Sequence, residues 1–323
     1  MLLRPRSPTL EALGVIAPGR PLRDGLDRVL QANKGALVIV GDGPDVLDIC
    51  SGGFLLDAEF SPQRMAELAK MDGAIILAHD ASRIARANVH LVPSPDVFTS
   101  ETGTRHRTAE RVARSIDVPV IAVSEDMGVI TLYRREAKHP LDSVPRLLNR
   151  SNQALQTLER YRNRLDAVTS SLSALEVEDL VTVQDVTTVL QRTEMVRRIA
   201  DEVVGYIVEL GADGRLVRLQ LEELMAGVDD DRRDVIRDYL VADEQAAADR
   251  ALRALGEMST ETLLDLHAVA RAMKLPVSDL DAGVAPRGYR LLAKIPRVSG
   301  RVVAAIVGRF GTLQKVMRAT TED

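Results

Sequence analysis

Four short runs of aliphatic residues in the first 140 positions constrain the fold most, because each has the length of a buried β-strand. Segments with helical patterning separate several of these runs. Continuous aliphatic runs are typical of strands that are covered on both faces of a sheet. The pattern predicts an α/β domain over residues 1–140, with a central mixed sheet flanked by helices and strands at residues 36–40, 74–78, 118–123 and 129–133.

One of the intervening helices has a clear start. Ser61 is suited to cap a helix, and Pro62 is favoured at the first helical position. This helix runs toward the strand at residue 74, and Asp72-Gly73 forms the turn between them. A carboxylate at the mouth of a strand is well placed for a site, but Asp-Gly is also ordinary turn chemistry.

After Pro140 the sequence becomes charged and helical. Seven aliphatic residues form one apolar stripe there, at spacings of three, four and seven, which predicts a long helix that needs a partner surface. The partner lies either in the same chain or in a second copy, and the pattern does not choose between them. We expect an all-α middle domain over residues 141–284. The stripe consists of Leu148, Leu155, Leu158, Leu165, Val168, Leu172 and Leu175.

The end of the chain is strongly basic. Eight Lys and Arg residues, and no Asp or Glu, lie between Arg287 and Arg318. They follow a segment with Pro and Gly at residues 282–288 that is typical of a linker. Residues 289–307 fit two helices around a tight turn, which indicates a helix-hairpin-helix-like domain that holds duplex DNA by its phosphates. A small basic helical cap fits the same pattern.

Composition excludes several other classes. The single cysteine, Cys50, can form neither an internal disulfide nor a CxxC redox or zinc motif. Residues 1–6 lack the apolar core of a signal peptide, and the longest aliphatic runs are too short to cross a membrane. No P-loop motif occurs, and Gly41-Asp42-Gly43 lacks the third glycine of a dinucleotide fingerprint, so it is interpreted as a plain turn. We expect a cytoplasmic protein with no membrane segment.

A candidate anion site lies at the start of a helix. Apolar residues within 109–116 repeat at helical spacing, so the helix begins just after Gly103. Its first turn carries the adjacent residues Arg105, His106 and Arg107. Because this end of a helix is electropositive, each added cation is unfavourable by roughly 0.3–1 kcal/mol when nothing else is present.

A bound polyanion reverses the sign of that effect. A phosphate at this helix start would accept the free backbone N–H groups, the hydroxyls of Thr104 and Thr108, and charge-assisted bonds from the arginines. A solvated basic helix start is the alternative. Among the five histidines only His106 lies in a polar cluster, and the other four are interpreted as structural.

A second group of polar residues follows the strand predicted at residues 118–123. Ser124, Glu125 and Asp126 lie at the same kind of strand end as Asp72. Carboxylates, hydroxyls and phosphate oxygens are the ligands that Mg²⁺ or Mn²⁺ would take. Taken alone, Ser-Glu-Asp also fits a plain loop.

Together these segments resemble the diadenylate cyclase family. The similarity rests on Asp72-Gly73-Ala74, on residues 87–93 (ANVHLVP), on residues 103–111 (GTRHRTAER) and on Ser124-Glu125. It extends through the helical middle to the helix-hairpin-helix tail and covers the whole chain. The resemblance implies an enzyme that condenses two ATP molecules into cyclic di-AMP and two pyrophosphates. It also implies a need for Mg²⁺ or Mn²⁺ and a homo-octamer in which paired catalytic domains face each other.

The resemblance implies roles for individual residues. Asp72 would assist metal binding and activation of the attacking ribose 3′-hydroxyl, and Gly73 would let the nucleotide approach the backbone. Leu91 would pack on adenine. The implied catalytic residues are Asp72, Gly73, Arg105, His106 and Arg107. The implied ATP-binding residues are Asp72, Gly73, Leu91, Gly103, Thr104, Arg105, His106, Arg107, Thr108 and Ser124, and the implied metal ligands are Asp72 and Glu125.

In the tail, residues 285–323, the resemblance implies contacts with double-stranded or branched DNA and a role in sensing DNA damage at the nucleoid. The family's tail holds two hairpins, whereas this chain reaches Asp323 after the first, and Arg297 and Ser299 stand where a hairpin has glycines. We therefore expect weak DNA binding. The implied contacts are Lys294, Arg297, Gly300 and Arg301.

Two other functions fit the same residues. The first is a DNA-binding scaffold whose nucleotide pocket senses ATP without catalysis. The second, less favoured, is a hydrolase or a nucleotidyltransferase with a different acceptor.

Overall fold

The computed structural model describes residues 7–240, 245–276 and 278–320, so residues 1–6, which bear on the signal-peptide prediction, lie outside it. The chain divides into two compact units. One comprises residues 1–152 and 203–218, and the other comprises residues 153–202 and 219–323. Within the described ranges, no helix combines the length and the apolar character needed to cross a membrane.

The first unit is built on a mixed sheet, as predicted. In the described residues its strands follow the order β2-β5-β4-β1-β6-β7-β8, and β3 pairs with β5. β1 (Ala36–Val40) runs parallel to β4 (Ala74–Leu77) and antiparallel to β6 (Val120–Ser124). These strands and β7 confirm the four predicted runs. The remaining strands are β2 (Cys50–Ser51), β3 (Phe54–Glu59), β5 (Arg83–Leu91), β7 (Val129–Arg134) and β8 (Ala137–Pro140).

The long strand β5 was not among the predicted strands. Its residues alternate between the core and more exposed positions near its end, where Ala87, Val89 and Leu91 are buried and His90 is exposed. Such alternation is a strand signal, but it contains no continuous aliphatic run. Strand β3 is nearly all exposed, and it too contains no continuous aliphatic run of strand length, so it was not predicted.

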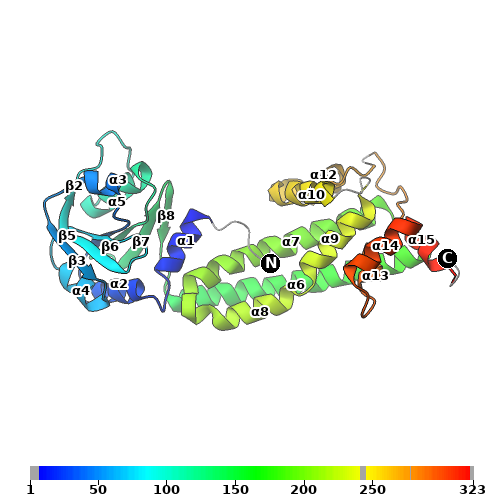
Figure 1. The fold of residues 1–323 in the computed structure, drawn as a ribbon, viewed down its shortest axis with the longest axis horizontal. Helices are drawn as coiled ribbons and strands as arrows, with labels where there is room; N and C mark the ends of the chain where they lie inside the picture. The colour runs from blue at the N-terminus through cyan, green and yellow to red at the C-terminus, as the bar shows by residue number, and fades with distance from the viewer. Residues whose placement is uncertain (1–6, 241–244, 277, 321–323) are drawn as a thin grey trace. The chain divides into compact units, whose positions relative to one another are not determined.

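Helices cover both faces of the sheet (Figure 1). Helices α1 (Pro8–Val15), α2 (Pro21–Gln31) and α4 (Pro62–Leu68) pack on one face, which Val38 of β1 joins. Helices α3 (Pro44–Asp48) and α5 (Thr104–Ser115) pack on the other, which Ile39 joins. The start of α4 is as predicted, since Ser61 Oγ accepts a hydrogen bond of 3.2 Å from Arg64 N. Alternation along β1 thus supplies two apolar layers to the core.

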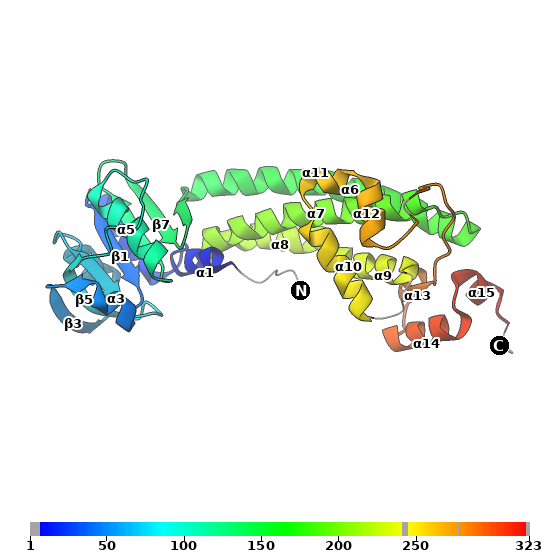
Figure 2. The ribbon, with the colours of Figure 1, turned by 90° about the horizontal axis from the view of Figure 1, so that it is seen from above.

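The second unit is helical in its described residues, as predicted. In the apolar stripe, Leu155, Leu158, Leu165 and Leu172 are buried. Leu165 of α6 lines the same small cavity as Val189 of α7 and Val235 of α9, so the stripe finds its partner in the same chain (Figure 2). The helices between residues 141 and 284, of which residues 144–152 and 203–218 belong to the first unit, are α6 (Val144–Glu178), α7 (Val183–Leu210), the 3-10 turn Gly211–Gly214, α8 (Arg215–Met225), α9 (Val228–Tyr239), α10 (Gln245–Glu257), α11 (Thr260–Leu264) and α12 (Leu266–Ala272).

The basic tail contains the predicted helix, turn and helix. These are α13 (Tyr289–Ala293) and α14 (Gly300–Phe310), followed by a third helix, α15 (Leu313–Arg318). Tyr289, Leu292, Val303 and Val307 form its small apolar core. The linker before it is held to the α6–α7 connection, because Val284 N donates to Val181 O and Val183 N donates to Ala282 O.

Candidate active site

Three strand ends bring predicted site residues to one edge of the sheet in the first unit. Because β1 and β4 are parallel, with Val38 opposite Ile75, both strands begin at this edge. β6 is antiparallel to β1, with Val123 opposite Ala36, so it ends there. The register therefore places Asp72 and Ser124 on either side of Gly35, which directly precedes β1.

Arg105 connects this edge to the first turn of α5. Its Nη2 donates a hydrogen bond of 2.9 Å to Asp72 Oδ1. A Cβ atom built on Gly35 would lie 2.5 Å from Arg105 Nη1, so a glycine here leaves room for the guanidinium group. The Asp72 side chain is 95% exposed, and the pair is therefore open to an incoming ligand. Gly35 carries no signal in the sequence, because only the parallel register of β1 and β4 brings it beside Asp72 and Arg105.

Gly73 has a structural role at the start of β4. A Cβ atom at this position would lie 2.4 Å from the carbonyl carbon of Asn88 on β5. Asn88 itself adopts a positive φ of 53°, close to an irregularity in the β4–β5 ladder. The glycine is thus needed for the close approach of two strands. Its predicted role toward a nucleotide stays a prediction.

The first turn of α5 is open, as an anion site requires. Gly103 is the N-cap and provides no side-chain cap. The first bond of the helix runs from Arg107 N to Gly103 O at 2.8 Å, so the preceding N–H groups are outside the helical ladder. Thr104 and Arg107 are exposed. The hydroxyl of Thr108 donates to Thr104 O at 3.0 Å and is thus directed toward its own helix.

The predicted metal ligands have few other carboxylates around them. Glu125 Oε1 lies 3.5 Å from Lys34 Nζ, a lysine that the sequence analysis missed, and Ser124 Oγ accepts a hydrogen bond from Met127 N. Throughout the described part of the chain, no group of three or more His, Cys, Asp or Glu residues could hold a metal ion by itself. Mg²⁺ is often bound by one or two carboxylates together with substrate phosphates, so Asp72 and Glu125 fit that kind of site.

His106 belongs to a polar chain that joins α5 to β7 and β8. His106 Nδ1 lies 2.9 Å from the hydroxyl of Tyr133, which donates a 3.1 Å hydrogen bond to Glu101 Oε1. Lys138 Nζ lies 2.5 Å from the same carboxylate oxygen. Burial lowers the pKa of His106 despite the nearby Glu101, and burial also raises the pKa of Tyr133. Tyr133 and Lys138 were not among the predicted site residues.

Leu91, the predicted adenine contact, is 6% exposed at the end of β5. It lies opposite Cys50 in the β2–β5 pair and belongs to the same apolar cluster as Ala74 and Val89. The contact with adenine stays a prediction.

The predicted DNA contacts in the tail lie at the surface of the second unit. Lys294, Arg297, Gly300 and Arg301 are all exposed, although Lys294 Nζ comes within 3.9 Å of Asp231. Arg297 adopts a φ of +69°, which a glycine would tolerate better. This positive φ supports the prediction that Arg297 occupies a position where a hairpin normally has a glycine.

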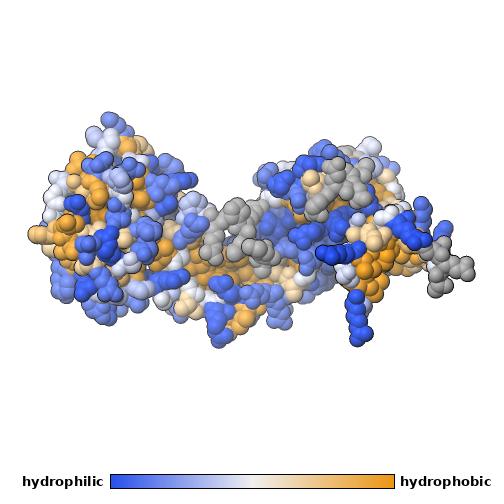
Figure 3. Space-filling view, in the orientation of Figure 1, coloured by the Kyte–Doolittle hydropathy of each residue, from blue (hydrophilic) through white to orange (hydrophobic). Residues whose placement is uncertain are grey.

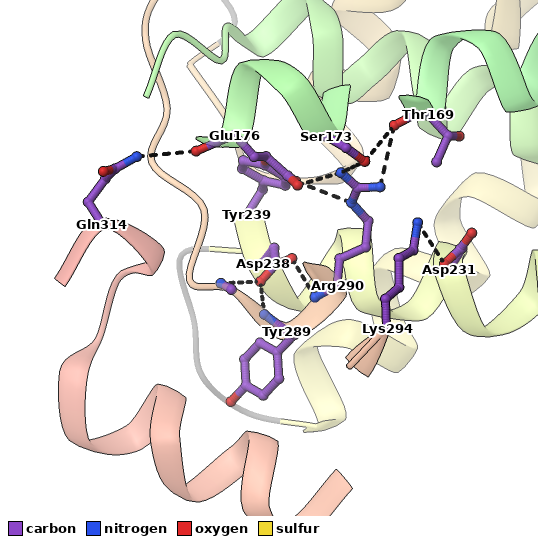
Figure 4. Close-up of polar contacts among 11 residues, drawn as sticks. Thr169, Ser173, Glu176, Asp231, Asp238, Tyr239, Tyr289, Arg290, Lys294 and Gln314 are labelled. Atoms are coloured by element: carbon purple, nitrogen blue, oxygen red, sulfur yellow. Dashed lines mark hydrogen bonds and ion pairs between the residues drawn. The ribbon is translucent and has the colours of Figure 1, made fainter. Parts of the chain in front are cut away.

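One of the eight basic residues of the tail, Arg290, is not available for DNA. This side chain is 0% exposed and forms a buried ion pair with Glu176 of α6. It also donates to Ser173 Oγ at 3.0 Å, while Tyr239 OH donates to Glu176 at 2.7 Å (Figure 4). Arg290 therefore fixes α13 to the middle helices and cannot contact DNA in this arrangement.

Two known protein families match this chain. Residues 23–138 match the family described as DisA bacterial checkpoint controller nucleotide-binding, and residues 141–280 match the family described as DisA bacterial checkpoint controller linker region. DacA from Staphylococcus aureus, a solved structure, is 22% identical over 42% of this chain and 91% of that chain, with a TM-score of 0.32.

Curated relatives align over nearly the entire chain. The DNA integrity scanning protein DisA of Frankia alni is 55% identical over 96% of this chain and 88% of that protein. DisA of Acidothermus cellulolyticus is 55% identical over 96% of this chain and 86% of the relative, and DisA of Streptomyces coelicolor is 50% identical over 97% and 85%. The chain therefore belongs to the DisA family, and the prediction of a diadenylate cyclase is confirmed.

Proposed function

We propose that the sheet edge formed by Asp72, Gly35 and the start of α5 is where two ATP molecules are condensed into cyclic di-AMP and two pyrophosphates. In each step a ribose 3′-oxygen attacks the α-phosphorus of the other ATP. The bond from that phosphorus to the pyrophosphate oxygen breaks, and the hydroxyl proton is released. One observation supports this proposal most directly. The exposed carboxylate of Asp72, the guanidinium group of Arg105 and the free N–H groups at the start of α5 lie together at this edge.

The chain's own residues act mainly by position and charge. Arg105, Arg107 and the N–H groups at the start of α5 would hold the triphosphate, which removes the unfavourable effect of two cations at a helix start. Asp72 lies beside Arg105 and would orient the attacking hydroxyl. Phosphoryl transfer requires little covalent work from a protein, so alignment and charge neutralisation dominate its rate.

We propose a divalent metal, Mg²⁺ or Mn²⁺, as cofactor. The exposed Asp72 carboxylate would be the main protein ligand, Glu125 the second, and phosphate oxygens would complete the shell. Such an ion supplies neutralisation of the charge on the triphosphate. Because Glu125 is 3.5 Å from Lys34 Nζ, its recruitment would require that lysine to turn toward a phosphate.

Self-association is part of this proposal. One pocket holds one ATP, and a symmetric product suggests two copies that face each other, as in the predicted octamer. The edge strand β3 supports a contact of this kind, because the side chains of Phe54 and Leu55 are 56% and 73% exposed and apolar side chains gather on this side of the sheet (Figure 3). We further propose the domain division 1–140, 141–284 and 285–323, a cytoplasmic location beside ATP and DNA, and DNA binding by the last domain.

The alternative is a DNA-binding scaffold whose pocket senses ATP, and the exposed cations of the tail fit DNA binding by either protein. One experiment separates the two. The purified protein is incubated with ATP and either Mg²⁺ or Mn²⁺, and the products are separated by chromatography, with Asp72→Asn as the inactive control. Formation of cyclic di-AMP by the wild type alone supports the enzyme. ATP binding without product under both metals supports the sensor.

A further inference from the structure

The polar chain behind His106 defines the direction of its hydrogen bonds. Glu101 is paired with Lys138 and, as a carboxylate, can only accept. The hydroxyl of Tyr133 therefore donates to Glu101, and its oxygen is left to accept from His106 Nδ1. Tyr133 remains a phenol, because burial and Glu101 both raise its pKa. The geometry thus selects the form of His106 that carries a proton on Nδ1.

The other ring nitrogen has a different environment. His106 Nε2 is buried and has no hydrogen-bonding partner among the described residues. A buried N–H donor without a partner is more unfavourable than a bare lone pair, so the neutral imidazole is preferred. The charged groups around it are Glu101, which favours protonation, and Lys138 and Arg105, which oppose it. With burial added, the balance is toward the neutral ring.

We infer that Tyr133 and Glu101 are positioning residues for the ATP site, because they hold His106 in its neutral, Nδ1-protonated form and so fix the first turn of α5. This inference rests on the proposed function. Adjacent residues on a helix point about 100° apart, so Arg105 and His106 hold this turn from two sides, toward Asp72 and toward Tyr133. The turn has no side-chain cap of its own, so this anchor is the side-chain contact that holds it to β7.

The inference changes the role of His106. The resemblance implied that His106 binds ATP, but its charge-bearing form is disfavoured and Nε2 is buried, so it does not act as a cation on the triphosphate. Its contribution is to present Arg105 and Arg107 in a fixed direction. Loss of the anchor should therefore weaken ATP binding more than it slows the chemical step.

The tautomer can be measured without any nucleotide. In a two-dimensional ¹⁵N–¹H spectrum of the full-length protein, we expect His106 to show a neutral ring with the proton on Nδ1. In Tyr133→Phe, which keeps the buried ring but removes the acceptor, the proton should redistribute to Nε2. Tyr161→Phe on α6 serves as the matched control and should leave the His106 signals unchanged. A wild-type His106 that is doubly protonated, or protonated on Nε2, would overturn the inference even if the protein makes no cyclic di-AMP.

Kinetics and a conservative rescue test the consequence. Tyr133→Phe should raise the KM for ATP about five- to tenfold, the effect of one lost hydrogen bond, with kcat reduced much less. His106→Asn, whose amide N–H can replace Nδ1–H, should retain more ATP affinity than His106→Ala. If Asn and Ala are equally impaired at unchanged thermal stability, Nε2 has a direct role and the positioning role is wrong. If the wild type makes no product while the tautomer is as expected, the proposed function fails and the anchor remains.

Discussion

At the scale of single residues, the Asp72–Arg105 pair shows how a carboxylate and a cation can lie side by side in the absence of a ligand. The pair is exposed on the Asp72 side, so it contributes only about 0–1 kcal/mol to stability. Both groups can therefore be redirected toward a nucleotide and a metal at little energetic expense. This distinguishes the pair at the proposed site from the buried Arg290–Glu176 pair, in which both side chains are at most 1% exposed.

Asp72→Asn tests this directly. We expect the unfolding temperature to change little, because the side chain is exposed, while cyclic di-AMP formation falls by orders of magnitude through loss of the proposed metal ligand. Thermal unfolding and product chromatography measure the two effects. Asp45→Asn, an exposed acid on α3, is the matched control and should behave like the wild type in both. Near-normal turnover in Asp72→Asn would remove this residue from the mechanism.

Gly73→Ala should act through the fold. The new Cβ would lie 2.4 Å from the Asn88 backbone, and backbone cannot move away as a side chain can. We expect a loss of several kcal/mol in the free energy of unfolding, of the order of other overpacked sites, measured by chemical denaturation. Gly43→Ala, where nothing lies within 4 Å of the Cβ atom, should cost less than about 1 kcal/mol. Equal stability of the two variants would show that Gly73 serves the nucleotide alone.

These residues also show what sequence alone could reveal. Arg105 and Arg107 stood out because they break a local rule, namely that cations are unfavourable at a helix start. Gly35 and Tyr133 break no local rule. Their importance arises from the parallel register of β1 and β4 and from the packing of α5 on β7, and neither was encoded within one segment. The residues of the proposed site thus stand out in the sequence where the chemistry is local and not where it depends on strand order.

At the scale of elements, the same distinction applies to the fold. Strands β1, β4, β6 and β7 were predictable because the interior of each is buried and its residues are mostly apolar. Strand β5 was not, because it carries Arg83, Arg86 and Asn88 among its buried residues. In the tail, the packing of α13 against α6 and α9 was also not predictable from the sequence. The burial of a basic residue such as Arg290 becomes apparent only when the helices are assembled.

The contact between β8 and the end of α7 gives a prediction on pH. His139 Nε2 lies 2.9 Å from Glu209 Oε2, and this hydrogen bond raises the pKa of His139 above its ordinary value. A pKa raised in the folded state stabilises the protein fully below the unfolded value of about 6.5, and this stabilisation is lost as the pH rises through the folded pKa. His139→Gln should therefore destabilise at pH 5.5 and have a smaller effect at pH 8.5.

The size of this effect is limited by solvent. The His139 side chain is 37% exposed, so we expect no more than about 1 kcal/mol between the two pH values. Denaturant titrations across this range provide the measurement, with His79→Gln, at an exposed position, as the control. A difference between wild type and His139→Gln that is constant with pH would mean that the pKa of His139 is the same in the folded and the unfolded protein.

At the scale of the whole molecule, a test of DNA binding by the tail has to leave intact the contacts that attach the tail to α6 and α9. Asp238 accepts hydrogen bonds from the backbone N–H groups of Gly288, Tyr289 and Arg290, and Glu176 holds the Arg290 side chain. Deleting the tail would remove the three backbone donors of Asp238 and the ion-pair partner of Glu176, and breaking such a buried pair typically costs several kcal/mol. A shortened chain would therefore lose stability as well as cations, and substitutions are the better test.

Five basic residues of the tail are exposed and form no ion pair with a carboxylate in the described parts of the chain. Each can neutralise one phosphate, so we expect weak, sequence-independent duplex binding with a log–log salt slope of roughly −3 to −5. Replacing them with Gln, one after another, should reduce the magnitude of the slope by about 1 each at unchanged stability. The residues are Arg297, Arg301, Arg309, Lys315 and Arg318.

Fluorescence anisotropy of a labelled duplex at several salt concentrations provides the measurement. Arg253→Gln on α10, an exposed cation outside the tail, is the matched control and should leave the slope unchanged. Oligomers that present several tails would raise the apparent affinity of wild type and control alike, but the loss of slope per substitution would persist. If the fivefold variant binds with the wild-type slope, the phosphates are held elsewhere on the molecule and the basic tail serves as a helical cap.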